Sequence, residues 1–304
     1  MIDYASLRAV AAVAETGSFE KAARILNVTP SAVSQRVKQL EDRIGAALIA
    51  RGNPCTATDK GAWLCRHMQH VGLLEQELFR ELPGLGGEEP GANRATIAVA
   101  VNADSLGSWF LPAAAQYSAR SGHLFNITVD DQDHTAEWLK RGHVLAAVTS
   151  LDKPVAGCRA LALGALRYRA TASPAFMARH FPAGVTVEAL AAAPSLTFNQ
   201  KDRLQEQWAM AALGSRAALT GHWLPSTQAF VDACLLGLGW GMNPDLLVRD
   251  HLAAGRLVEL VPGAHLDIAL FWQINRLAAD QLTQLTAAVS QASKACLVIG
   301  KSQI

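Results

Sequence analysis

Apolar residues in the first part of the chain recur at helical spacing and stop at turn residues. Leu7, Val10 and Val13 share one face of a first predicted helix, which Gly17 can end. Ser18 is a good N-cap for a second short helix. The pattern therefore predicts two short helices separated by a tight turn.

A third helix is predicted after a second turn. Thr29 is a good N-cap, and Pro30 stands at the first helical position, where its missing N–H costs little. The apolar face of this helix, at steps of four, three and four residues, consists of Val33, Val37, Leu40 and Ile44. The opposite face starts with small hydroxyls and an amide, which can approach base edges and phosphates in a major groove. The arrangement predicts a helix-turn-helix, although a structural helical bundle with a polar face has the same periodicity.

A narrow apolar stripe runs along a longer predicted helix over residues 59–81. Its members, which are the predicted dimerisation residues, are Leu64, Met68, Val71, Leu74 and Leu78. A stripe of this width suits a helix that pairs with its twin, although it could also pack on the chain's own domain. Residues 83–91 are rich in Pro and Gly, which indicates a linker.

Strand-like and helix-like segments alternate beyond the linker. Strands are predicted at residues 96–101, 126–131 and 146–149, with helices between them, and this order predicts parallel crossovers in an α/β domain. A second α/β unit is expected over about 165–268, after which a strand at 265–274 returns to the first unit. Two such units form a cleft at the carboxyl ends of their strands.

Charge is distributed unevenly along a chain of 304 residues whose formal net charge is only +1. Residues 21–40 carry four basic side chains and no acidic one, whereas residues 59–90 carry three basic and six acidic side chains. A local positive patch is what phosphate contact needs, although a solvated helix face can have the same charge. Near-neutrality of the whole chain therefore does not exclude a nucleic-acid partner.

Composition and motifs exclude several other classes. Half of the residues are hydrophobic and 17% are charged, which excludes a disordered chain. The five cysteines form no C-x-x-C pair, and the sequence holds no metal-spaced His/Cys cluster, no G-x-S-x-G and no phosphate-binding loop. We therefore expect no metal, no cofactor and no enzymatic activity. A secretory signal and apolar stretches of roughly 20 residues are missing, so a cytoplasmic protein without membrane contact is expected.

Two ordered motifs carry a family resemblance. Residues 17–23 and 29–41 resemble the signature of LysR-type regulators, residues 47–51 resemble the wing strand of that family, and residues 58–61 resemble the start of its linker helix. The resemblance implies a winged helix-turn-helix and a two-lobed effector domain like that of periplasmic binding proteins. The implied domains are residues 1–58 for DNA binding, 59–91 for linkage and dimerisation, and 92–304 for the effector, with lobe 1 at about 92–164 and 269–304 and lobe 2 at about 165–268.

One branch of the family matches more closely. Residues 101–106, 129–131 and 184–186 resemble the ArgP/LysG (IciA) branch, as do Trp109 and Ser226 with their neighbours. The resemblance implies a transcription regulator that senses lysine or arginine and controls its export or metabolism. Its implied partners are double-stranded DNA and a second or further copies of the chain in a homodimer or homotetramer, with RNA polymerase as a further candidate. The alternatives are a LysR-type regulator with another effector and a solute-binding protein.

Candidate DNA-binding residues follow from the polar face of the third helix and the wing. Gln35 can pair bidentately with adenine, and Arg36 and Lys38 can reach phosphates. The full predicted set is Thr29, Pro30, Ser31, Ser34, Gln35, Arg36, Lys38 and Arg51.

Candidate effector-binding residues follow the predicted strands of the α/β domain. A basic amino acid offers one carboxylate and two cations; helix N-termini can bind the carboxylate, and aspartates can face the cations. The predicted set is Asn102, Asp104, Ser105, Asp130, Asp131, Thr149, Thr197, Ser226 and Thr227. Helix capping explains Asp104 and Ser105 equally well, and a solvated strand end explains Asp130 and Asp131.

Overall fold

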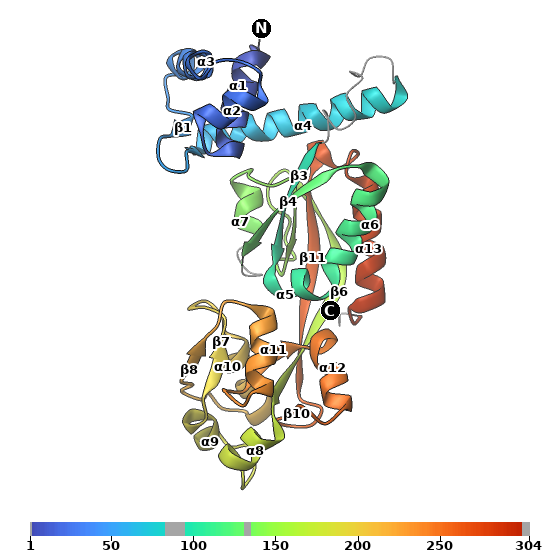
Figure 1. Ribbon diagram of the computed structural model, residues 1–304. Helices are drawn as coiled ribbons and strands as arrows, with labels where there is room; N and C mark the ends of the chain where they lie inside the picture. Colours follow the sequence, from blue (N-terminus) through green and yellow to red (C-terminus); the bar gives the residue numbers. More distant parts are fainter. Residues whose placement is uncertain (1, 83–94, 131–134, 300–304) are drawn as a thin grey trace.

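The structure, a computed structural model, describes residues 2–82, 95–130 and 135–299. Figure 1 shows a small helical head, a long helix that lies across its base, and an elongated α/β domain of two lobes. The predicted α/β class with a mainly helical N-terminal domain is confirmed. The predicted linker at residues 83–91 lies outside the described residues.

The head consists of three helices and a short hairpin, with the bounds α1 Tyr4–Thr16, α2 Phe19–Ile25, α3 Pro30–Ile44, β1 Ile49–Ala50 and β2 Thr56–Ala57. Each predicted cap is present. Gly17 adopts a φ of 68° after α1, and the side chains of Ser18 and Thr29 accept backbone N–H bonds at the starts of α2 and α3. The glycine is needed because side chains disfavour positive φ.

The core of the head forms from the predicted apolar faces. Leu7, Val10 and Val13 of α1 are buried together with Val33 and Val37 of α3. The prediction is wrong for one residue of this face. Ile44 is 39% exposed, because it is the last residue of α3 and stands beside the turn at Gly45.

The long helix is α4, Asp59–Glu81, and it is fixed to the head at several points. Thr58 caps it by accepting the N–H of Gly61. Gly61 itself lies so close to the head that an added Cβ would be 2.0 Å from the carbonyl oxygen of Leu48. Side-chain contacts also join Arg8 to Glu75 at 3.1 Å and Tyr4 to His67 at 3.3 Å. α4 is therefore held against the head by contacts from its first residues to Glu75.

Lobe 1 is built on a sheet whose strands are β3 Thr96–Asn102, β4 Leu124–Asp130, β5 Ala146–Thr149, β6 Cys158–Ala172 and β11 His265–Asn275. Their order is β4-β3-β5-β11-β6, with β3 parallel to β4 and β5, and β11 antiparallel to β5 and β6. The helical elements that cover it are α5 Ala103–Ser105, a π-helical turn at Leu106–Phe110, α6 Leu111–Ser121, α7 Thr135–Lys140 and α13 Thr283–Cys296. A 3-10 turn, Arg276–Ala278, precedes α13.

Lobe 2 is reached along β6 and left along β11, the two long strands that connect the lobes in Figure 1. Its elements are α8 Pro174–His180, α9 Val187–Ala192, β7 Ser195–Thr197, α10 Leu204–Leu213, β8 Gly221–Trp223, α11 Thr227–Leu235, β9 Gly241–Pro244, α12 Asp245–Ala253 and β10 Val258–Glu259. β9 and β10 pair with β6, and β7 pairs in parallel with β8. The expected return of the last strand to lobe 1 is thus present.

Large aromatic side chains fill the interior of both lobes. Trp208 and Trp240 lie with their ring centroids 5.4 Å apart in lobe 2, and Trp109 and Trp272 are buried in lobe 1. These four rings are part of the hydrophobic core and do not line the cleft between the lobes. Among the described residues, no helix combines the length and the apolar character that a membrane crossing requires.

Candidate functional site

The polar face of α3 is open to solvent. Ser31, Gln35 and Lys38 are exposed and follow one another at helical spacing, while Ser34 and Arg36 beside them are partly buried. Thr29 and Pro30 are also exposed at the start of the helix. The α3 N-terminus therefore presents small polar groups at the surface, a shape that a major groove can accept.

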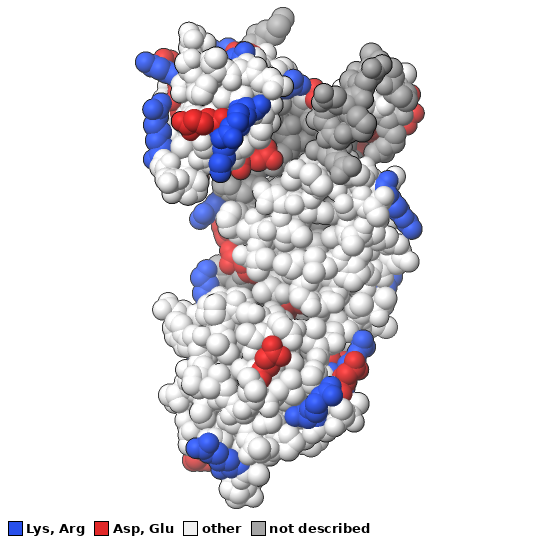
Figure 2. All heavy atoms as spheres, in the orientation of Figure 1, with Lys and Arg blue, Asp and Glu red and all other residues white. Residues whose placement is uncertain are grey.

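The hairpin beside α3 is fixed to that helix. The Glu41 carboxylate on α3 accepts the N–H of Leu48 at 2.7 Å and that of Ile49 at 3.2 Å, which sets the start of β1. Arg51 is exposed and its guanidinium lies 5.7 Å from the ring centroid of Phe19. Figure 2 shows Lys and Arg side chains on the head, whereas much of the visible face of the α/β domain is uncharged.

The predicted dimerisation stripe is divided between two surroundings. Leu64 and Met68 pack against the core of the head. Leu74 and Leu78, farther along α4, are 53% and 47% exposed. Within one copy of the chain, the outer half of the stripe is thus the part that is free to meet another surface.

A cleft lies between the lobes, where the carboxyl ends of β3 and β4 face lobe 2. Its empty space is about 660 Å³, part of it open to solvent. The lining comes from both lobes and includes Asn102, Asp104, Asp130, Phe198, Lys201, Asp202, Arg203, Gln207, Thr227, Phe230 and Asn243.

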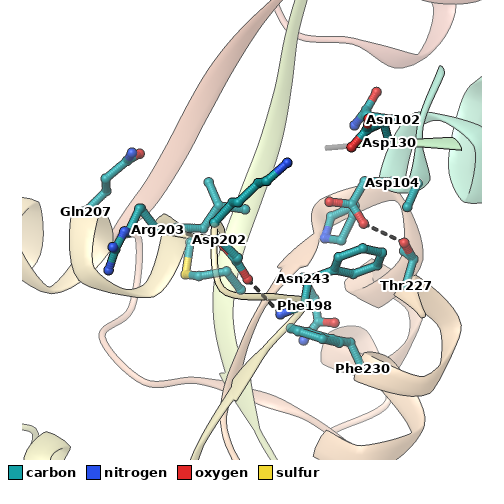
Figure 3. A pocket seen from close by; sticks show the side chains of 15 residues that line it. Asn102, Asp104, Asp130, Phe198, Asp202, Arg203, Gln207, Thr227, Phe230 and Asn243 are labelled. Carbon is teal, nitrogen blue, oxygen red and sulfur yellow. Dashed lines mark hydrogen bonds between the residues drawn. The ribbon is translucent and has the colours of Figure 1, made fainter. Parts of the chain in front are cut away.

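Asp104 joins the two lobes at the back of this cleft. Its carboxylate accepts the Tyr168 hydroxyl at 2.7 Å. It also accepts the Thr227 hydroxyl at 2.6 Å (Figure 3). Tyr168 is buried on the crossing strand β6, and Thr227 is the first residue of α11 in lobe 2. Gly107 lies against the same threonine, since a Cβ there would be 3.6 Å from the Thr227 methyl. The carboxylate is therefore held in one orientation by two neutral donors.

Three further oxygen acceptors surround the cleft. Asp130 accepts the indole N–H of Trp138 at 3.0 Å. Asn102 and Asn243 are buried, and within the described part of the chain their side-chain carbonyl oxygens have no hydrogen-bond partner. A buried acceptor without a donor is costly, so these amides favour a ligand that supplies N–H groups.

The other end of the cleft carries basic groups on lobe 2. Arg203 and Gln207 lie far from Asp104 in Figure 3, at the start of α10. Asp202 shapes this loop by accepting the N–H groups of Phe198 at 2.9 Å and Leu204 at 3.0 Å. No ion pair to the Lys201 ammonium is found in the described ranges. Sequence reasoning missed this loop, although its place directly after β7 was a signal that could have found it.

Comparisons with known proteins agree with this architecture. The family described as "Bacterial regulatory helix-turn-helix protein, lysR family" matches residues 4–62. The family described as "LysR substrate binding domain" matches residues 90–293. The transcriptional regulator ArgP of Pseudomonas aeruginosa (strain UCBPP-PA14) is 42% identical over 286 residues, which cover 94% of each chain.

The chain belongs to the LysR family of transcriptional regulators.

Two solved LysR-family structures extend over the full chain. The crystal structure of ArgP from Mycobacterium tuberculosis has a TM-score of 0.79 and 39% identity, covering 99% of this chain and 100% of that one. Full-length LysG from Corynebacterium glutamicum, solved with bound effector Arg, has a TM-score of 0.69 and 33% identity, covering 98% and 100%. The predicted ArgP/LysG resemblance is confirmed. The relatives are transcriptional regulators, so the chain is a DNA-binding regulator with a small-molecule effector domain and is not an enzyme.

The LysR-type effector domain does not bring all the predicted residues into the cleft. Asn102, Asp104, Asp130 and Thr227 line it. The lining does not include Ser105, Thr149, Thr197 and Ser226. Ser105 and Thr149 are fully buried, and Ser226 caps α11 by accepting the N–H of Ala229. Asp131 lies outside the described residues.

Proposed function

We propose that this regulator senses a basic amino acid, arginine or lysine, in the cleft and controls the export or metabolism of that amino acid. The observation that carries the proposal is the set of acceptors in the cleft lining, which includes the carboxylates of Asp104 and Asp130 and the buried amide oxygens of Asn102 and Asn243. A guanidinium group has five N–H donors and an ammonium has three, and neither has an acceptor. The arginine bound in the LysG structure supports the same ligand class.

The two ends of the cleft suggest the orientation of the ligand. Its side-chain cation is proposed to lie against Asp104 and Asp130 of lobe 1, and its α-carboxylate, which shares a carbon with the α-ammonium, is proposed to lie toward Lys201 of lobe 2. Opposite charges at the two ends would draw the lobes onto one ligand. Phe198 and Phe230 supply apolar walls for the carbon chain between them.

In this proposal, residues 1–58 bind DNA in the cytoplasm, residues 59–91 pair two copies, and residues 92–304 bind the effector. The DNA contacts are assigned to the polar face of α3 and to Arg51, and the outer part of the α4 stripe is assigned to the dimer seam. Two copies would place two α3 helices on successive major-groove faces of a near-palindromic site. A homotetramer and contact with RNA polymerase are further parts of the proposal.

Calorimetric titration of the full chain tests the ligand assignment. L-Arginine and L-lysine are expected to bind, whereas L-citrulline, which replaces the guanidinium by a neutral urea group, is expected to bind at least about 10-fold more weakly. Asp104→Asn is expected to reduce arginine affinity by about 10- to 100-fold, because a hydrogen bond to a charged group is worth about 1.5–3 kcal/mol. Equal affinity for arginine and citrulline, or no binding of either basic amino acid, would refute the proposal.

A further inference from the structure

Side chains in contact join the wall of the cleft to the surface that faces α4. Trp138 on α7 donates its indole N–H to Asp130, which lines the cleft. On its other side the Trp138 ring meets His143 edge-on, with centroids 5.6 Å apart and an interplanar angle of 82°. His143 directly follows Gly142. Contacts through Trp138 and His143 therefore link Asp130 to this turn.

Gly142 forms a seat for the side chain of Arg66 on α4. An added Cβ at Gly142 would lie 2.1 Å from one guanidinium nitrogen and 2.3 Å from Cζ, so the guanidinium occupies the space that any other residue would fill. The guanidinium also lies over the ring of Trp63, whose centroid is 4.3 Å from Cζ. Arg66 is thus partly buried between lobe 1 and its own helix, and this burial lowers its pKa.

α4 packs against both the head and the α/β domain. Cys65 and Met68 pack against the core of the head, and burial raises the pKa of the Cys65 thiol to about 11. One turn beyond Met68, Leu73 is buried in the core of the α/β domain. The helix that carries Arg66 therefore contacts both lobe 1 and the DNA-binding head.

We propose that Trp138, Gly142 and Arg66 are positioning residues that transmit the state of the cleft to the DNA-binding head. The proposal rests on the proposed effector site and adds the route by which that site acts. The Gly142 backbone and the Trp63 ring both lie against the guanidinium, so a movement of the Gly142 turn displaces the Arg66 side chain. A ligand cation that competes with Trp138 for Asp130 would move the Trp138 ring. That movement would shift His143 and the Gly142 turn, against which Arg66 lies.

The test is a double-mutant cycle on DNA affinity without any effector. The full chain is titrated onto a labelled DNA fragment from upstream of its own gene, and binding is followed by fluorescence anisotropy. Asp130→Asn, a change at the cleft, is expected to alter DNA affinity by about threefold or more. In a Gly142→Ala background, where the added methyl group displaces Arg66, the same change is expected to have an effect below about 1.5-fold.

A matched control separates loss of contact from backbone strain. Gly122 has a φ of 73°, close to the 71° of Gly142, and an added Cβ there meets nothing within 4 Å. Gly122→Ala is therefore expected to retain the threefold response to Asp130→Asn. If Gly142→Ala does not fold, Arg66→Ala replaces it, since it removes the guanidinium without changing the turn.

Each outcome decides the proposal. No effect of Asp130→Asn on DNA affinity, survival of that effect in Gly142→Ala and Arg66→Ala, or its loss in Gly122→Ala would overturn it. A second titration adds L-arginine, and Gly142→Ala is expected to keep arginine binding but lose its effect on DNA affinity. If no basic amino acid binds the unmodified chain, the proposed function fails, while the cycle without effector still decides whether the route exists.

Discussion

Replacing Thr227 by valine tests whether the Asp104 carboxylate holds the two lobes together. Valine keeps the shape of threonine but removes the hydroxyl that donates to Asp104 at 2.6 Å. Thr227 is 8% exposed, so water has little access to take the place of the lost donor. A hydrogen bond to a charged group contributes about 1.5–3 kcal/mol, and we expect a loss of that size in the free energy of unfolding.

Urea unfolding followed by tryptophan fluorescence measures this loss, because Trp208 and Trp240 are buried in lobe 2. Thr227→Ser is the matched control, since it keeps the hydroxyl and removes the methyl group next to Gly107. Its expected cost is only about 0.8 kcal/mol for one buried carbon. Valine must therefore destabilise the protein more than serine does. The opposite order would refute the role of the Asp104–Thr227 bond.

Three further predictions concern other parts of the molecule. Gln35→Ala is expected to weaken binding to the specific DNA site by about 1–3 kcal/mol, whereas Lys38→Ala weakens all sequences and reduces the salt slope by about one; equal loss of specificity in gel shifts would contradict this division. Leu74→Glu is expected to shift the chain toward the monomer in analytical sedimentation and to leave arginine affinity unchanged, and an unaltered mass would remove Leu74 from the seam. Burial lowers the pKa of His70 below 6.5, so the unfolded chain binds the proton more readily and stability falls as the pH drops through about 6.5. His70→Gln should make the free energy of unfolding less sensitive between about pH 7 and 5, which urea titrations at both pH values can measure.

Local signals made the head and the order of the elements predictable. Gly17, Thr29 and Pro30 mark helix ends because capping depends on neighbouring residues, and the structure has each of these ends. The last residue of α3, Ile44, was misjudged because periodicity does not say where the covering helices stop. Sequence spacing thus locates a face more reliably than it locates the limit of that face.

The cleft was less predictable because its chemistry joins distant residues. Asp104 meets Tyr168 and Thr227, which are 64 and 123 positions away along the chain. Helix capping explained Asp104 equally well at the level of sequence, and only the fold reveals the two hydroxyl donors. The contact between Arg66 and Gly142 could not be predicted for the same reason, because the sequence around a turn glycine does not indicate which distant side chain packs against it.

The central claim is that a basic amino acid in the cleft changes how the head binds DNA. Fluorescence anisotropy of the full chain on DNA from upstream of its own gene, with increasing L-arginine or L-lysine and with L-citrulline as the neutral control, tests it most directly. The account predicts that at least one basic amino acid changes DNA affinity by about fivefold or more and that citrulline does not. Specific DNA binding that responds equally to citrulline, or to none of the three, would contradict it.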